Sequence, residues 1–337
     1  MNILGIIASS RPAVAPQVLA IGHQVSPRIS VYDWSGGFGA KYSDPATLPA
    51  GNVTGIDFNA ASNTIALSHI TTPFVSVYPW SSTGFGAKYA NPASLPVANC
   101  YAIDFNTAGN VLILGVESTP YVEAYAWSAG FGSKYSNPAT TPTGTGSGVK
   151  FNVADDTVAV AHTTSPRISV YPWSAGFGTK YANPATLPTG DGVGVAWKPQ
   201  GDAIAVTHDI SPYVSAYPWS AGFGTKYANP ATLPTGQGTK CEWNPAGTVL
   251  AVGHENSPYV SAYPWSSGFG TKYANPATPP TGNVQGVSFS SDGALLATAH
   301  TTTPFTSVYD FSGGFGTKYA NPATLPAGNG AAAKFNK

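Results

Sequence analysis

The sequence predicts an all-β fold, a seven-bladed β-propeller made of four-stranded antiparallel blades. Three observations lead to this fold: a repeat of 46 or 47 residues, short β-rich runs divided by turn residues, and no sustained helical period of apolar residues. Four short strands in each repeat are typical of propeller blades. The repeat is marked by a Tyr-x-Trp or Tyr-x-Phe triplet that ends at Trp34, Trp80, Trp127, Trp173, Trp219, Trp265 and Phe311.

Each repeat divides into four predicted strands, A to D. Strand A ends at Phe58 and its equivalents, strand B at His69, and strand C at Trp80, while strand D surrounds Lys88 and Tyr89. Clusters of Gly, Pro, Asn, Asp and Ser separate these runs, as expected of turns. Because the strands alternate in direction, B–C turns and D–A loops share one rim of the ring, and A–B turns and C–D loops share the other.

Ring closure follows from the residue count. Seven repeats account for residues 15–337, which we expect to form a single propeller domain, and residues 1–14 remain as an N-terminal extension, either an arm or an extra strand. The last repeat stops where the first resumes, so we expect residues 332–336 to supply strand A of the first blade. Closure of this kind leaves no open seam with exposed strand edges.

The composition excludes several classes of partner. Charged residues make up only 9% of the chain, and the formal net charge is +0, which argues against nucleic-acid binding and against an anionic membrane surface. No apolar run is long enough to span a bilayer, so we expect no membrane insertion. The N-terminal residues have no basic region, and we expect no signal peptide. Cys100 and Cys241 fall on distant blades and should be free thiols.

The run from Gly286 to Phe311, GVSFSSDGALLATAH followed by SVYDF, resembles a WD repeat. Tyr32-Asp33-Trp34 and Tyr309-Asp310-Phe311 occupy the position of that family's closing aromatic and Asp. The resemblance implies a binding platform and names no ligand. The near-identical YPWSxGFGxKYANPATLP units are also similar to tandem-repeat propellers encoded by bacteriophages, which implies a place on a virion. Most repeats depart from the WD pattern by carrying proline instead of the Asp: Pro79, Pro172, Pro218 and Pro264.

Candidate catalytic residues are few. The chain offers no Ser, His and acid that stand apart from the repeat as a trio, so we expect no catalytic residues and no cofactor. All six histidines end strand B, and equivalent positions on separate blades cannot converge on one ion. We therefore predict no metal site and assign these histidines to structural hydrogen bonds: His23, His69, His162, His208, His254 and His300.

Charges gather on strand A, one residue before its closing aromatic. Lys334 neighbours Asp57, and Asp104 neighbours Lys150, so we predict inter-blade ion pairs at two blade boundaries; the alternative is a polar channel that binds a small ligand or ion. Around the ring this position reads Lys334, Asp57, Asp104, Lys150, Ala196, Glu242 and Ser288.

Two further groups of residues are candidates for binding. The first is a ring on the rim of the B–C turns, where amphipathic aromatic residues and arginine favour binding to proteins or sugars. The second is an asymmetric patch on the third blade, where Glu117 follows Val116, which replaces the histidine, and Glu123 replaces a serine; drift of an amplified repeat is the alternative. The rim ring consists of Arg28, Phe74, Tyr121, Arg167, Tyr213, Tyr259 and Phe305.

These features favour a non-enzymatic binding or structural propeller. We expect a virion-displayed module, a capsid decoration or part of a tail fibre, that contacts a partner protein or a cell-surface glycan. The alternative is a propeller enzyme of the lyase or lactonase type acting at the channel mouth. An enzyme should show acids or histidines clustered in the channel lining.

Overall fold

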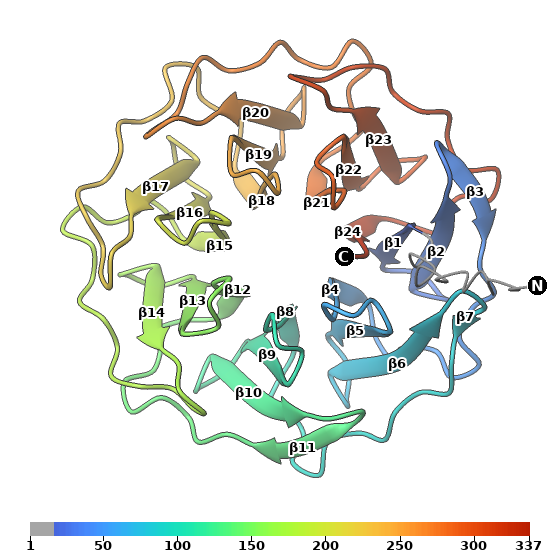
Figure 1. The fold of residues 1–337 in the computed structure, drawn as a ribbon, viewed down its shortest axis with the longest axis horizontal. Coiled ribbons are helices and arrows are strands. Elements are labelled where there is room, and N and C mark those ends of the chain that lie inside the picture. The colour runs from blue at the N-terminus through green and yellow to red at the C-terminus, as the bar shows by residue number, and fades with distance from the viewer. Residues whose placement is uncertain (1–16) are drawn as a thin grey trace, which may run out of the picture.

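A computed structural model describes residues 17–337, and the extension predicted for residues 1–14 lies outside them. Seven antiparallel sheets surround a central channel (Figure 1), which confirms the seven-bladed propeller. The first blade consists of β24 (Gly330–Phe335), β1 (Val18–His23), β2 (Ile29–Trp34) and β3 (Phe38–Lys41), from the channel outwards. The second blade consists of β4 (Val53–Phe58), β5 (Thr64–His69), β6 (Val75–Ser81) and β7 (Gly84–Phe85). The third consists of β8 (Cys100–Phe105), β9 (Val111–Val116), β10 (Val122–Trp127) and β11 (Phe131–Lys134).

The remaining four blades have three strands each, one fewer than predicted. They are β12 (Gly146–Phe151), β13 (Thr157–His162) and β14 (Ile168–Pro172); β15 (Gly192–Trp197), β16 (Ala203–His208) and β17 (Val214–Pro218); β18 (Gly238–Trp243), β19 (Val249–His254) and β20 (Val260–Pro264); and β21 (Val284–Phe289), β22 (Leu295–His300) and β23 (Thr306–Asp310).

Proline contributes to the loss of the outer strand in three of these blades, although the second blade, with Pro79 at the same position, keeps the short β7 by pairing through Trp80 and Ser81. In the fourth, fifth and sixth blades the third strand ends in Pro172, Pro218 or Pro264, and proline has no N–H to donate to an outer strand. Only isolated bridges remain there, such as the one between Trp173 and Phe177. In the seventh blade Asp310 N–H still bonds to the carbonyl of Thr317, at 3.0 Å.

The ring closes between the two ends of the chain, as predicted. The inner strand β24 pairs with β1 in an antiparallel register from Leu19 opposite Phe335 to His23 opposite Gly330. The amide of Val18 also donates to the Asn336 side chain, at 2.8 Å. Figure 1 shows the red C-terminal strand lying inside the blue N-terminal ones.

Aromatic residues form the core between blades. Trp34 packs edge-on against Phe38 of its own blade, Tyr319 of the preceding blade and Phe335 of the inner strand, with ring centroids 5.1 to 5.7 Å apart. The buried Tyr32 adds a polar link, because its hydroxyl donates to the Thr324 carbonyl at 2.8 Å, 292 residues away. The repeat thus carries an apolar cluster and a hydrogen bond across most blade boundaries.

Candidate functional site: the axial channel

The seven inner strands line the channel, and the alternation of side chains along each strand decides which of them reach it. The residue before the closing aromatic belongs to a charged layer around the axis, as the sequence indicated. Three ion pairs cross this layer. Lys150 contacts Asp104, Lys334 contacts Glu242 at 3.0 Å, and Lys337 contacts Asp57 at 3.4 Å.

The expected pairing of Lys334 with Asp57 is wrong. Lys334 extends past the seventh blade to Glu242 of the sixth, a partner 92 residues away. Asp57 is instead contacted by Lys337 and by the amide of Phe105, at 2.9 Å, both on Oδ2, while its buried Oδ1 has no hydrogen-bond partner among the described residues. A long lysine side chain at the axis of a closed ring can reach a carboxylate two blades away. The order of the blades in the sequence therefore does not determine which carboxylate the lysine pairs with.

Asp57 and Asp104 are buried and differ in their titration. Burial raises the pKa of Asp104, and Lys150 only partly opposes this. For Asp57, burial would also raise the pKa, but Lys337, Lys150 and Lys334 outweigh it and the pKa is lowered. Asp104 also accepts the Phe151 amide at 2.8 Å. Both carboxylates therefore hold neighbouring blades together as well as shaping the charge of the channel.

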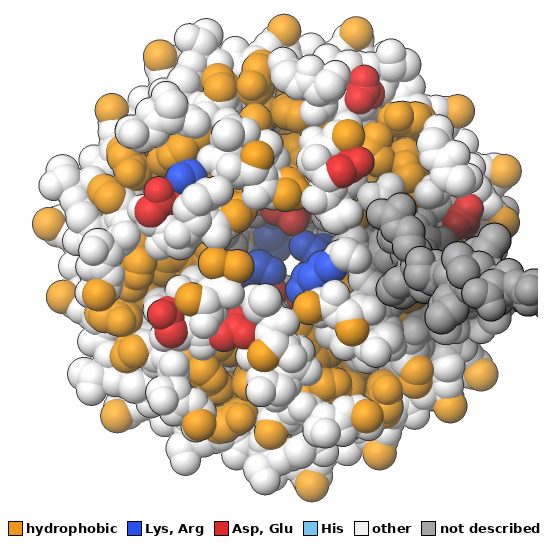
Figure 2. All heavy atoms as spheres, viewed as in Figure 1, with side chains coloured by type: hydrophobic (Ala, Val, Ile, Leu, Met, Phe, Trp, Pro, Cys, Tyr) orange, Lys and Arg blue, Asp and Glu red, His pale blue; other side chains and the backbone are white. Residues whose placement is uncertain are grey.

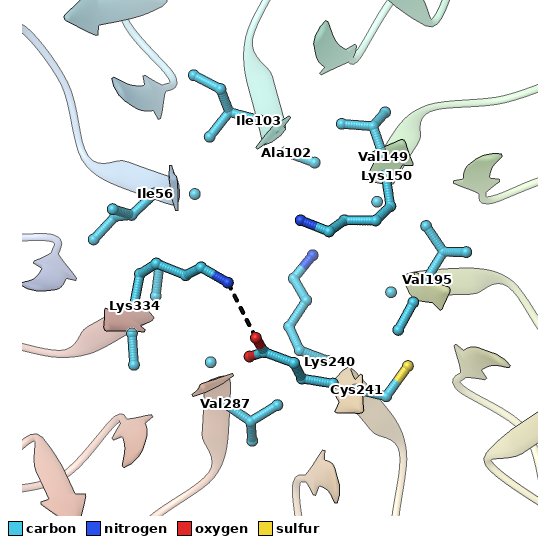
Figure 3. A pocket seen from close by; sticks show the side chains of 18 of the residues that line it. Ile56, Ala102, Ile103, Val149, Lys150, Val195, Lys240, Cys241, Val287 and Lys334 are labelled. Carbon is cyan, nitrogen blue, oxygen red and sulfur yellow. Dashed lines mark hydrogen bonds and ion pairs between the residues drawn. The ribbon is translucent and has the colours of Figure 1, made fainter. Parts of the chain in front are cut away.

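An axial cavity of about 230 Å³ lies inside this layer. Its lining includes Lys150, Lys240, Lys334 and Glu242, and Figure 3 shows the amino groups of the three lysines directed toward the axis. In the space-filling view most of the Lys and Arg side chains on that face gather at the centre of the ring, with acidic side chains beside them and other acids scattered over the face (Figure 2). The cavity thus concentrates positive charge in an otherwise sparsely charged molecule.

A second, wider cavity of about 640 Å³ adjoins the first. Glu117 lies in its wall, and the carboxylate of Glu117 accepts hydrogen bonds from Asn99 at 2.8 Å and from the Tyr101 hydroxyl at 3.2 Å. The two cavities share several lining residues, so they form one continuous funnel. The shared residues are Thr54, Tyr101, Lys240, Gln285 and Ala331.

Sequence reasoning missed Lys240, although a signal for it exists. At its position in the inner strand the other six blades carry only glycine or alanine. These are Gly55, Ala102, Gly148, Gly194, Gly286 and Ala332.

The structure places the third-blade patch in two different environments. Glu117 faces the funnel, but Glu123 is fully buried. Its carboxylate accepts hydrogen bonds from Lys134 at 2.7 Å and from the Tyr125 hydroxyl at 3.1 Å. Glu123 therefore cannot contact a partner, and its assignment to a docking patch is wrong.

The rim ring lies apart from the cavities. All seven residues are partly buried and have left-handed backbone conformations, with φ from 66° to 70°. Arg28 and Arg167 each donate to a proline carbonyl at 3.2 Å. None of the seven lines either cavity, and their role in binding stays a prediction.

The histidines stabilise the turns between the second and third strands. His162 Nε2 lies 3.0 Å from the Ser169 hydroxyl, and the other five histidines make the same contact at 3.0 or 3.1 Å. Burial lowers the pKa of each to about 4, so they are neutral at pH 7. Within residues 17–337 no group of three or more His, Cys, Asp or Glu side chains could hold a metal ion.

The fold and the channel together define a seven-bladed propeller with a charged axial cavity. Solved structures with this architecture cover nearly the whole chain. One from Bacteroides uniformis has 12% identity and a TM-score of 0.72, and covers 96% of this chain and 100% of its own. One from Bacteroides fragilis has 12% identity and a TM-score of 0.74, and covers 97% and 100%. Both are named provisionally as 6-phosphogluconolactonases.

A protein from Lactobacillus plantarum is similar at 13% identity and a TM-score of 0.75, covering 96% of this chain and 100% of its own. No family model matches the chain, and no curated protein does. At these identities the structural likeness establishes the fold alone.

These comparisons correct the functional expectation. The interpretation as a non-enzymatic, virion-displayed binding module is contradicted, because two of the propellers that match are named as lactonases. Neither the WD-repeat resemblance nor the bacteriophage resemblance finds support in the comparisons. In the described part of the chain, no helix is both long and apolar enough to cross a membrane.

Proposed function

We propose that this protein is a hydrolase of the lactonase type, which opens an anionic lactone in the axial cavity. The observation that carries the proposal is the combination of Lys150, Lys334 and Glu242 in one cavity of about 230 Å³. The names of the two Bacteroides structures support the same reaction class.

Lactone hydrolysis requires an activated water molecule and stabilisation of the oxygen that becomes negative. The Glu242 side chain is 26% exposed, and one of its oxygens accepts a hydrogen bond from Lys334. The carboxylate can take a proton from water as the water oxygen attacks the carbonyl carbon. The Lys334 and Lys150 ammonium groups can stabilise the developing oxyanion. The ring C–O bond then breaks, and the leaving oxygen receives the proton.

The charge of the channel selects the substrate class. Lys150, Lys240, Lys334 and Lys337 face the three carboxylates of Asp57, Asp104 and Glu242. The excess is Lys240, which with a pKa of about 8 is mostly protonated at pH 7, and it attracts an anion because a narrow cavity with low-dielectric walls focuses its field. A phosphorylated sugar lactone meets this requirement.

The test follows proton release during hydrolysis of 6-phosphogluconolactone and of the unphosphorylated gluconolactone in a pH-stat. We expect catalysis above the spontaneous rate, with preference for the phosphorylated lactone, and loss of about 10²-fold or more in Glu242→Gln. Lys198→Gln is the matched control, because Lys198 pairs with Asp202 on a surface turn. Rates equal to the buffer blank for both lactones would refute the proposal.

A further inference from the structure

We propose that Lys240 is a nucleophilic lysine that forms an imine with small aldehydes carrying an anionic group. The inference does not rest on lactone hydrolysis. It starts from the one position of the inner strand where a single blade carries a functional group and the six others carry glycine or alanine.

The contacts of Lys240 differ from those of the other channel lysines. Its Nζ donates to the carbonyl of Ser147 at 2.7 Å and to the carbonyl of Val193 at 3.1 Å. No carboxylate of the described residues lies within ion-pair distance of this amino group, whereas Lys150 and Lys334 each contact one. Two carbonyl acceptors match the two N–H groups of a neutral amine, which would keep its lone pair free.

Burial acts in the same direction. It lowers the pKa of Lys240 to about 8, because the charged form loses hydration. At pH 7.4 the neutral fraction is therefore roughly 250-fold larger than for a lysine with the usual pKa of 10.5. Desolvation next to other cationic groups is a known way of activating an amine as a nucleophile.

Access and attraction come from the two cavities. Lys240 lines both of them, so a ligand that enters the wide funnel meets its amino group where the funnel narrows. Lys150 and Lys334 line the same narrow cavity and can hold an anionic group of the ligand (Figure 3). An aldehyde of this kind would place its carbonyl carbon beside Nζ.

The reaction is a condensation that needs no redox partner. The amine lone pair attacks the carbonyl carbon, and a proton moves from nitrogen to oxygen through solvent. The hydroxyl group then takes the second proton of the nitrogen through solvent and leaves as water, and a C=N bond remains.

The experiment uses pyridoxal 5′-phosphate as the probe, with borohydride reduction of the imine and peptide mapping by mass spectrometry. We expect Lys240 to be labelled at least about tenfold faster than Lys198, with half-maximal labelling near pH 8. Unphosphorylated pyridoxal should react more slowly, and inorganic phosphate should protect Lys240.

Lys240→Arg keeps the positive charge but cannot form the imine, and Lys198→Arg is its matched control. The first should lose the rapid phase of labelling and the second should keep it, with thermal unfolding measured for both to confirm folding. Labelling spread over surface lysines, equal labelling by pyridoxal, or an unchanged rapid phase in Lys240→Arg would overturn the proposal. Because the readout is covalent labelling, failure of lactone hydrolysis would leave this result unaffected.

Discussion

Lys134 reaches the buried carboxylate of Glu123 at 2.7 Å, inside the third blade. The corresponding lysines of the other six blades contact an Asn or Asp three residues further along the chain: Lys41, Lys88, Lys180, Lys226, Lys272 and Lys318. In the third blade Val116 replaces the histidine that elsewhere bonds to a serine, and Glu123 replaces that serine. Both departures from the repeat thus fall on the two positions of one blade that form the histidine–serine bond in the other six.

This relationship predicts a specific loss of stability. Lys134→Met should lower the free energy of unfolding by about 3 kcal/mol, because it leaves a buried carboxylate without its cation. Lys180→Met is the matched control; it removes a contact with the exposed Asn183 and a long one, at 3.4 Å, with the Tyr181 carbonyl, and should cost less than about 0.5 kcal/mol. Chemical denaturation of both variants measures the difference. Equal midpoints would show that the Lys134–Glu123 pair contributes nothing.

The buried histidines predict loss of stability in acid. Their pKa in the folded protein is about 4, below the usual 6.5, so between these values the unfolded chain binds more protons. Stability should therefore be complete above pH 6.5 and should fall as the pH drops toward 4. Each histidine contributes a slope of up to about 1.4 kcal/mol per pH unit in this window.

Thermal unfolding measured from pH 8 to pH 4.5 checks this expectation. His162→Gln should be less stable at pH 8, where the bond to Ser169 is lost, but should show a shallower pH dependence than the parent protein. An unchanged slope in this variant would mean that His162 is already protonated in the folded ring.

The closing strand predicts the effect of one added methyl group. A Cβ on Gly286 would lie 2.6 Å from the amide nitrogen of Ala333, on the neighbouring inner strand β24. Gly286→Ala should therefore destabilise the protein by about 1 to 3 kcal/mol, because backbone must shift to relieve the overlap.

Gly37→Ala is the control, since its Cβ would meet only Tyr319, at 3.9 Å. Its effect should stay within about 0.5 kcal/mol. Urea unfolding compares the two variants, and a Gly286→Ala protein as stable as Gly37→Ala would indicate that β24 packs less closely against β21.

The sequence alone determined the architecture. Its period places each residue at the same point of every blade, and that is enough to predict seven blades, the closing strand and the structural bonds of the histidines. The physical reason is that these features depend on contacts within a blade or with the next one, and the repeat carries both partners of each contact. His162 and Ser169, for example, recur together in six of the seven blades.

The tertiary structure alone decided the channel. Lys334 pairs with Glu242 rather than with Asp57, because a flexible side chain at the axis can reach several blades and the closed ring sets which carboxylate is near. The isolation of Lys240 likewise depends on the absence, among residues 17–337, of a carboxylate across the axis from it. Contacts of this kind join residues on different blades, and their geometry exists only once all seven blades have packed into the ring.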